Sequence, residues 1–347
     1  MLLSLMTVSS CTKKYEGKVS NHFDGKRFFD PEMNYKKNFW DFLKWKFNYK
    51  SVACPDHVDV IKYDHPPQRV AGDGLRISNV GHVTFLIQTQ GLNILTDPVW
   101  SERASPVSFA GPKRVINPGI KFEDLPPIDV VWISHNHYDH MDISTIKRLW
   151  KKHRPRIITP LGNASVIHSY DEEIEVETYD WQDEIIISNS IKFHLTPMQH
   201  WSARGFFDHN KSLWAALTIQ TDGGNIYFIG DSGYGRGRYF KKDKEQFGEF
   251  RAALIPMGAY EPRWFMEYAH MNPDEMLKAY NDLGQPYTVP SHYDVFKLTD
   301  EGRGEARDQL KISMKKQGIG SKIKLLEVGQ FWDVPKLPGK KGLKQQL

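Results

Sequence analysis

Cysteine is scarce in this sequence, since Cys11 and Cys54 are the only two among its 347 residues. Two cysteines cannot supply the ligand set of a zinc ribbon. A disulfide between them would only tie the start of the chain to its body. Any zinc ion must therefore be held by histidine and carboxylate side chains.

The sequence also lacks a long apolar run and a strong charge imbalance. No segment after the first ten residues approaches the roughly 20 apolar residues of a transmembrane helix. The 46 basic and 42 acidic side chains leave a formal net charge of +4, which is too small to indicate nucleic acid binding, so we predict no nucleic-acid partner. With 13% aromatic residues, the composition is that of a globular protein of one large or two modest domains.

The first ten residues are largely apolar and end in Val-Ser-Ser before Cys11. This pattern resembles the lipobox of a bacterial lipoprotein precursor, in which Cys11 would be lipidated. No basic residue precedes the run, which is also short, so a misassigned start or a chance resemblance is the alternative. We expect a membrane-associated protein, an outer-membrane or periplasmic lipoprotein anchored at Cys11, with a cytoplasmic protein as the alternative.

Composition divides the chain into four parts. We predict a leader and tether over residues 1–22, an N-terminal extension over 23–74, a main domain over 75–335 and a basic tail over 336–347. Residues 35–50 of the extension mix Phe and Trp with Lys and predict a basic aromatic helix. Such a helix could lie on an anionic membrane surface. Alternatively, its aromatic face packs on the main domain while the lysines stay solvated.

A strand, turn and strand pattern occurs twice, over residues 81–96 and 214–230. Both copies contain Ile-Gln-Thr, a glycine turn, Asn-Ile and an aspartate after the second strand, which is Asp97 in one copy and Asp231 in the other. The ordered repeat predicts two halves that are built alike. Each half would present its aspartate at the same edge of its sheet.

Short strands and helices fill the rest of the main domain without a clean break. The pattern predicts helices over 143–153 and 304–317, a helix opened by Asn272, and strands over 156–159, 184–187, 191–196, 252–256, 287–290 and 322–328. Strands predominate and helices fall between them. The prediction is a layered α+β sandwich with sheets inside and helices outside.

Four metal-ligand side chains lie within six residues, His135, His137, Asp139 and His140, directly after an apolar strand. In an extended segment residues two apart project to one side, so His135 and His137 can reach one metal ion. The turn that follows changes the direction in which Asp139 and His140 project. This spacing suits two adjacent ions better than one, whereas a histidine-rich surface loop is the alternative.

Three further candidates, His200, Asp231 and His292, each follow a predicted strand at a local break. Strand ends are places where distant chain segments can converge on one site. Singly, each is more often a core or surface residue. Together with the cluster they complete a set of seven.

The ordered set His-x-His-x-Asp-His, an isolated His, an Asp after a strand and a final His resembles the metallo-β-lactamase superfamily. The run Tyr-Glu-Pro-Arg-Trp-Phe-Met at residues 260–266 is narrower and resembles the N-acylphosphatidylethanolamine-hydrolysing phospholipase D family. The resemblance extends over residues 75–332 and departs at 291–294, where the better-known relatives have His-Trp-Gly. We therefore expect this protein to share metal binding with the family, whereas the resemblance does not predict its headgroup or acyl-chain preference.

The resemblance implies an α+β fold, the αββα four-layer sandwich of the metallo-β-lactamase type, with two zinc ions per chain between the sheets. His135, His137 and His200 would hold one ion. Asp139, His140 and His292 would hold the other, and Asp231 would bridge them. The implied nucleophile is a hydroxide shared by the metals, which also polarise the phosphoryl oxygen.

Asp97 and His270 are the further catalytic candidates, besides Asp139 and Asp231. Asp97 could orient a ligating histidine by accepting its other N–H, or could merely form a turn. His270 matches a family position near the metals and could assist proton transfer. Arg263 could contact an anion or form an ion pair inside the fold.

We expect a zinc-dependent phosphodiesterase that cleaves a glycerophospholipid on the headgroup side, releasing phosphatidic acid and an amine-bearing alcohol. A lactonase or small-molecule phosphodiesterase of the same superfamily is the first alternative, because the same site can attack phosphorus or a carbonyl carbon. A non-catalytic, metal-stabilised envelope protein is the second. The expected partners are a phospholipid or other ester substrate and a membrane surface, and a homodimer is an open alternative to a monomer.

Overall fold

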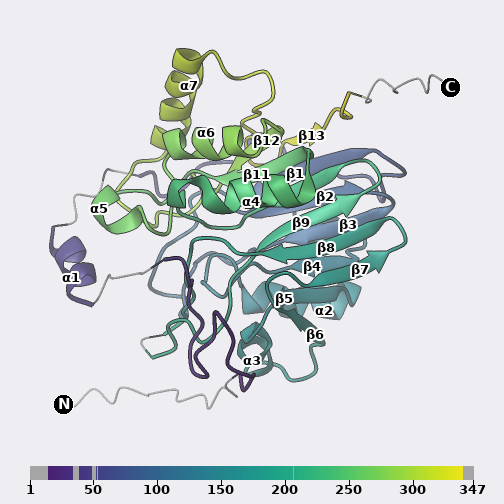
Figure 1. Cartoon of the computed structure of the whole chain (residues 1–347). Helices are drawn as coiled ribbons and strands as arrows, with labels where there is room; N and C mark the ends of the chain where they lie inside the picture. Colours follow the sequence, from purple (N-terminus) through teal and green to yellow (C-terminus); the bar gives the residue numbers. More distant parts are fainter. Residues whose placement is uncertain (1–14, 34–38, 49–51, 53, 206, 339–347) are drawn as a thin grey trace.

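Two β-sheets lie face to face in the computed structural model, and helices cover their outer sides (Figure 1). The structure describes residues 15–33, 39–48, 52, 54–205 and 207–338. Cys11 and the leader therefore lie outside the described residues, as does most of the predicted tail. None of the described helices is long and apolar enough to cross a membrane.

The first sheet has seven strands in the order β13-β1-β2-β3-β4-β5-β6. They are β1 (Leu75–Gly81), β2 (Thr84–Thr89), β3 (Leu92–Thr96), β4 (Val130–Trp132), β5 (Arg156–Pro160), β6 (Val176–Tyr179) and β13 (Phe331–Asp333). The second sheet has six strands in the order β12-β11-β10-β9-β8-β7. They are β7 (Glu184–Ser188), β8 (Ile191–Thr196), β9 (Ala216–Thr221), β10 (Asn225–Phe228), β11 (Phe250–Pro256) and β12 (Tyr287–Ser291).

The two halves are built alike, as the repeated hairpin predicts. In the first sheet β2 and β3 are antiparallel, and β4 then runs parallel to β3. In the second sheet β9 and β10 are antiparallel, and β11 runs parallel to β10. Asp97 directly follows β3, and Asp231 comes three residues after β10. The repeat in the sequence is thus a repeat in the topology.

Seven α-helices are described. They are α1 (Phe39–Phe47), α2 (Ile143–His153), α3 (Asn163–His168), α4 (Arg238–Phe247), α5 (Arg263–Met266), α6 (Pro273–Asp282) and α7 (Glu305–Gln317). The predicted ends of α2 are confirmed, and Asp142 caps it by accepting the N–H of Ser144. A capping box between Asn272 and Glu275 begins α6.

Alternation along the strands sorts apolar side chains into three core layers. Phe85 and Ile87 of β2 pack between the sheets, whereas Leu86 packs under α2. In β11, Leu254 points between the sheets and Ile255 points toward the helices α4, α6 and α7. Three core layers separate four structural layers. The predicted α+β, αββα sandwich is therefore confirmed.

The strand predicted over residues 322–328 is not formed. Ile323 makes a single bridge to Thr288 of β12, and the chain then leaves that sheet. Ile323 packs in the core beside the second sheet, but Leu326 packs between the sheets. The segment crosses from the edge of one sheet to the edge of the other, where β13 pairs with β1, so it cannot stay paired along its length.

The described part of the predicted basic aromatic helix is α1, which contacts α5. Trp45 stacks on Phe265 at 5.2 Å and donates its indole N–H to Asp300. Trp40 and Phe47, however, are 75% and 86% exposed. One aromatic side chain thus packs on the main domain while others face outward.

Asp243 of α4 is a buried carboxylate in the layer between α4 and the second sheet. It accepts the hydroxyl of Tyr227 at 2.6 Å and that of Thr196 at 3.1 Å. Burial raises its pKa to about 7. Between pH 4 and pH 7, the folded protein therefore keeps a proton on Asp243 that the unfolded chain has already lost.

We expect Asp243→Asn to stabilise the protein relative to wild type by an amount that grows from pH 5 to pH 8. In wild type, the stability contribution of Asp243 decreases as pH rises from the unfolded pKa to the folded pKa, whereas the amide does not ionise. Urea unfolding at both pH values measures the difference. Asp222→Asn, in an exposed turn, should show no such trend. An equal gap at both pH values would contradict a raised pKa.

Candidate metal centre

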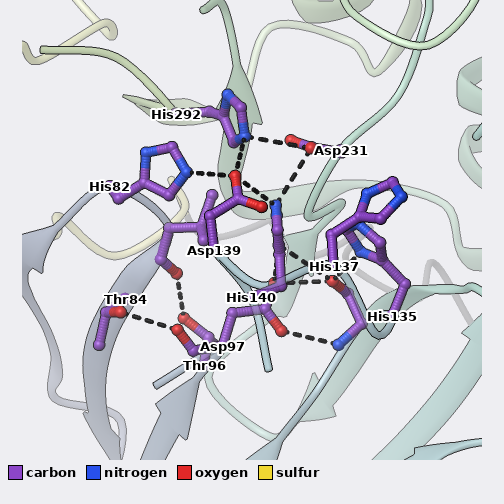
Figure 2. Close-up of polar contacts among 12 residues, drawn as sticks. His82, Thr84, Thr96, Asp97, His135, His137, Asp139, His140, Asp231 and His292 are labelled. Carbon is purple, nitrogen blue, oxygen red and sulfur yellow. Dashed lines mark hydrogen bonds and ion pairs between the residues drawn. The ribbon is translucent and has the colours of Figure 1, made fainter. Parts of the chain in front are cut away.

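The seven predicted ligand side chains meet at one edge of the two sheets, and Figure 2 labels all of them except His200. They come from segments that follow β4, β8, β10 and β12. His137 is half-buried, and the other six are buried. The structure therefore brings together all seven residues that the sequence places at strand ends.

The first group consists of His135, His137 and His200. Nδ1 of His137 lies 2.8 Å from Nε2 of His135 and 3.2 Å from Nε2 of His200. Burial holds the pKa of each below its ordinary value, to about 3 for His137, so these imidazoles are neutral. Neutral imidazole is the form that binds metals. Three converging ring nitrogens therefore fit a metal ion.

The second group consists of Asp139, His140, His292 and Asp231. Oδ2 of Asp231 lies 3.1 Å from Nε2 of both His140 and His292, and Oδ2 of Asp139 lies 3.2 Å from Nε2 of His292. Oδ2 of Asp231 is also 3.8 Å from Nε2 of His200 in the first group. Asp231 thus lies between the groups. Its Oδ1 is buried and has no hydrogen-bond partner among the described residues, so it is available to a cation.

Charge is distributed unequally across the site. Burial by itself would lower the pKa of His292, but the carboxylates of Asp231 and Asp139 raise it to about 9. The same carboxylates raise the pKa of His140 against the effect of burial. Burial would raise the pKa of Asp231, but the imidazoles of His292 and His140 lower it well below its ordinary value. Burial would likewise raise the pKa of Asp139, but His140 and its other imidazole neighbours lower it well below its ordinary value. Asp139 and Asp231 are therefore both anionic.

Glycine allows the chain to approach the site closely at two positions. A Cβ atom on Gly258, after β11, would lie 1.7 Å from the carbonyl oxygen of His292. Gly230 has φ +69°, and a Cβ atom there would meet Oγ of Ser134 at 2.6 Å. Glycine at these positions lets the segments bearing Asp231 and His292 pack against their neighbours.

Asp97 makes the contact that its expected role requires. Its Oδ2 lies 2.7 Å from Nδ1 of His140 and accepts the hydroxyl of Ser134 at 2.7 Å, and its Oδ1 accepts the N–H of Ser134. Asp97 and His140 are both fully buried. Asp97 therefore fixes the ring of His140 with Nε2 directed toward Asp231 (Figure 2).

His270 lies beside both groups. Its Nδ1 is 3.8 Å from Oδ2 of Asp231, and its ring centre is 5.4 Å from those of His200 and His292. The loop that carries it also orients a ligand candidate, because the carbonyl of Ala269 lies 3.1 Å from Nδ1 of His200.

Arg263 forms an ion pair inside the fold. It donates to Glu275 at 2.7 Å and to the carbonyl of His270 at 3.0 Å. Its guanidinium thus holds the loop that carries His270.

Two aromatic residues that flank the ligand candidates form part of the surroundings. The ring of Trp201 lies 4.4 Å from that of His137 and stacks on His209 at 5.2 Å. The hydroxyl of Tyr138 donates to the carbonyl of Arg204. Trp201 thus packs against the first group, whereas Tyr138 packs against the apolar cluster that contains Val99 and Phe296.

Sequence reasoning missed His82. Its Nε2 lies 2.9 Å from Oδ2 of Asp139, and its side chain is 1% exposed. The sequence prediction placed it within a strand, whereas the structure has a turn between β1 and β2 at this residue. The signal was a histidine directly after Gly81, since His82 is the only titratable residue between Arg76 and Asp97 in the sequence.

Comparisons with known proteins agree with this geometry. The family model described as a beta-lactamase superfamily domain matches residues 92–293. The chain belongs to this superfamily. It is 36% identical over 272 residues to N-acyl-phosphatidylethanolamine-hydrolyzing phospholipase D 1 of Caenorhabditis elegans, which covers 75% of this chain and 76% of that protein.

A second relative by sequence and one solved structure of similar fold agree with this assignment. The mitochondrial N-acyl-phosphatidylethanolamine-hydrolyzing phospholipase D of Saccharomyces cerevisiae is 33% identical, over 69% of this chain and 52% of its own length. An isothiocyanate hydrolase from Delia radicum gut bacteria has a similar fold, with a TM-score of 0.60 and 20% identity over 74% of this chain and 98% of that chain. The protein is therefore a metal-dependent hydrolase of the metallo-β-lactamase fold, in the family of these phospholipases.

We expect Asp97→Asn to weaken metal binding by about 10- to 100-fold, because an amide cannot fix His140 as the carboxylate does. Competition with a chromophoric chelator, with zinc as the probe ion, measures the affinity. Asp222→Asn, the same substitution in an exposed turn, serves as the control. Unchanged affinity in Asp97→Asn would show that His140 needs no such support.

Proposed function

We propose that this protein is a zinc-dependent phosphodiesterase of the N-acylphosphatidylethanolamine phospholipase D type. The observation that carries the proposal is the donor set of seven residues, in two adjacent groups that share Asp231. Identity of 36% and 33% to two N-acyl-phosphatidylethanolamine-hydrolyzing phospholipases D supports the choice of substrate class.

Zinc fits this donor set, because imidazole nitrogen and carboxylate oxygen are its usual ligands where cysteine is absent. His135, His137 and His200 would hold one ion, and Asp139, His140 and His292 the other, with Asp231 shared. Bound zinc ions activate water at neutral pH and polarise a phosphoryl oxygen.

The surrounding residues supply positioning and proton transfer. Burial lowers the pKa of His270 to about 4, so its ring is neutral at pH 7. Its Nδ1 has no hydrogen-bond partner among the described residues and is the atom that would accept the proton of the attacking water. The water oxygen bonds to phosphorus as the bond to the headgroup oxygen breaks. His270 would then give this proton to the departing headgroup oxygen, so that the products are phosphatidic acid and the amine-bearing alcohol.

We expect purified protein to contain about two zinc ions per chain and to release phosphatidic acid from N-acylphosphatidylethanolamine. Asp231→Asn and His135→Ala should abolish this activity without unfolding the protein, because each removes a ligand. His57→Ala, whose side chain is 51% exposed, should retain activity. Elemental analysis and mass spectrometry of the lipid products give the readouts.

A panel that contains both phospholipids and lactones separates the proposal from its first alternative. An opened lactone ring with unchanged lipids would replace the proposed substrate class. Protein without bound metal, or full activity in Asp231→Asn, would contradict the mechanism.

We further infer that the protein works at an anionic membrane surface. On α1, the aromatic side chains of Trp40 and Phe47 are 75% and 86% exposed, and Lys44 and Lys46 lie in its last turn. Aromatic side chains with lysines at one surface are typical of helices that lie at a lipid interface. Trp45 joins α1 to α5, the helix in the loop that leads to His270. This arrangement would bring the lipid surface near the metal centre.

The double variant Trp40→Ala/Phe47→Ala should sediment with anionic phospholipid vesicles several-fold less than wild type, because each substitution removes exposed apolar area that would enter the interface. Binding of wild type should also fall as salt is raised. Ile312→Ala, at an exposed apolar residue of α7, is the control. Equal sedimentation of all three proteins would argue against contact through α1.

A further inference from the structure

His82 occupies a position where three parts of the site meet. It lies in the two-residue turn that joins β1 to β2, with φ +62°. Its ring centre is 4.1 Å from that of His292 and 5.3 Å from that of Phe296, whose ring is nearly perpendicular to it. Figure 2 shows its Nε2 directed at the carboxylate of Asp139. The side chain is thus fixed on several sides.

The main chain of the same residue holds a second ligand candidate. The carbonyl of His82 accepts the backbone N–H of His292 at 3.0 Å. His292 itself has φ +65°, a conformation that few side-chain-bearing residues adopt and that needs support from its surroundings. One turn residue therefore contacts Asp139 through its ring and His292 through its backbone.

We propose that His82 is a positioning residue that orients Asp139 and His292 for metal binding, an inference that rests on the proposed metal centre. Its Nε2–H donates to Oδ2 of Asp139. The Asp139 oxygen has a second lone pair that stays available to a cation. Imidazole donors to ligating carboxylates fix the rotamer of the carboxylate and thereby strengthen the site.

A role as an eighth ligand is less consistent with the contacts. Asp139, His140, His292 and the shared Asp231 already provide four protein groups, the number typical of a zinc site. Nε2 of His82 faces a carboxylate oxygen, and its buried Nδ1 has no hydrogen-bond partner among the described residues. The proton of the His82 ring therefore lies on Nε2, which donates a hydrogen bond to the carboxylate of Asp139.

The position of His82 also connects the two halves of the fold. The turn that carries it belongs to the first sheet, whereas His292 follows β12 of the second sheet. Asp139 comes from the loop between β4 and α2. His82 thus fixes a ligand candidate from each half relative to the other.

Two substitutions separate a hydrogen-bond donor from a metal ligand. The side-chain amide of His82→Gln can donate from the place of Nε2 but is a poor ligand for zinc, whereas His82→Phe keeps a ring without a donor. We expect His82→Phe to bind the more weakly held zinc ion about 10- to 100-fold less tightly, and His82→Gln to stay close to wild type. Titration with zinc against a chromophoric chelator gives affinity and stoichiometry without any substrate.

Cobalt in place of zinc adds a spectroscopic readout, because its visible absorption reports ligand geometry. His82→Phe should change that spectrum, and His82→Gln should restore it. If His82→Gln binds zinc as poorly as His82→Phe and the stoichiometry falls from two to one, His82 is a ligand and the proposal is wrong. If His82→Phe binds zinc as tightly as wild type, the ring of His82 only packs and the proposal is also wrong. Wild-type protein that binds no zinc would instead overturn the metal centre itself.

Discussion

The carboxylate of Asp231 is the contact on which the arrangement of the site depends. It lies at the end of a hairpin in the second sheet, yet its Oδ2 reaches His140 from the first sheet and His292 from its own. Both histidines are fully buried, so their charge is balanced by this carboxylate and by Asp139 rather than by solvent. The two similar halves of the chain therefore meet through a charged contact at their common edge.

Buried polar groups are costly unless each has a partner, which explains how much of the fold serves to hold this edge. Asp142 caps α2 directly after the histidine cluster, and it also accepts the backbone N–H groups of Trp100 and Ser101. The helix after the cluster and the loop after Asp97 are thus tied to one carboxylate. Asp97 in turn holds His140. The contacts that orient His140 therefore belong to the same network that holds α2 and the loop after β3 in place.

The sequence predicts the parts of this site that depend on local spacing. His135 and His137 share a register, and Asp97 and Asp231 follow copies of one hairpin, so both pairs could be recognised without a structure. The layers could be predicted too, because period-2 apolar strands separate helices with clear caps. Local spacing does not show which ligands share a metal ion. The resemblance to known phospholipases supplied that assignment of the seven residues to two ions.

What could not be predicted depends on distant partners. The sequence around His82 reads as a continuous strand, but a two-residue turn at this position separates β1 from β2. Its partner Asp139 lies 57 positions away. Residues 322–328 alternate like a strand, but the edge available to them pairs only at Ile323. In both cases the local pattern is compatible with two structures. Tertiary contacts between the sheets determine which one forms.

The loop after β11 shows why a narrow sequence motif can accompany a widely shared metal site. Arg263, Glu275 and the carbonyl of His270 form one connected set of contacts, and Ala269 accepts from His200. Phe265 of the same segment stacks on Trp45 and so contacts α1. The loop thus contacts the ligand candidate His200 at one end and α1 at the other. Its sequence is constrained by both contacts, which are separate from the ligand set itself.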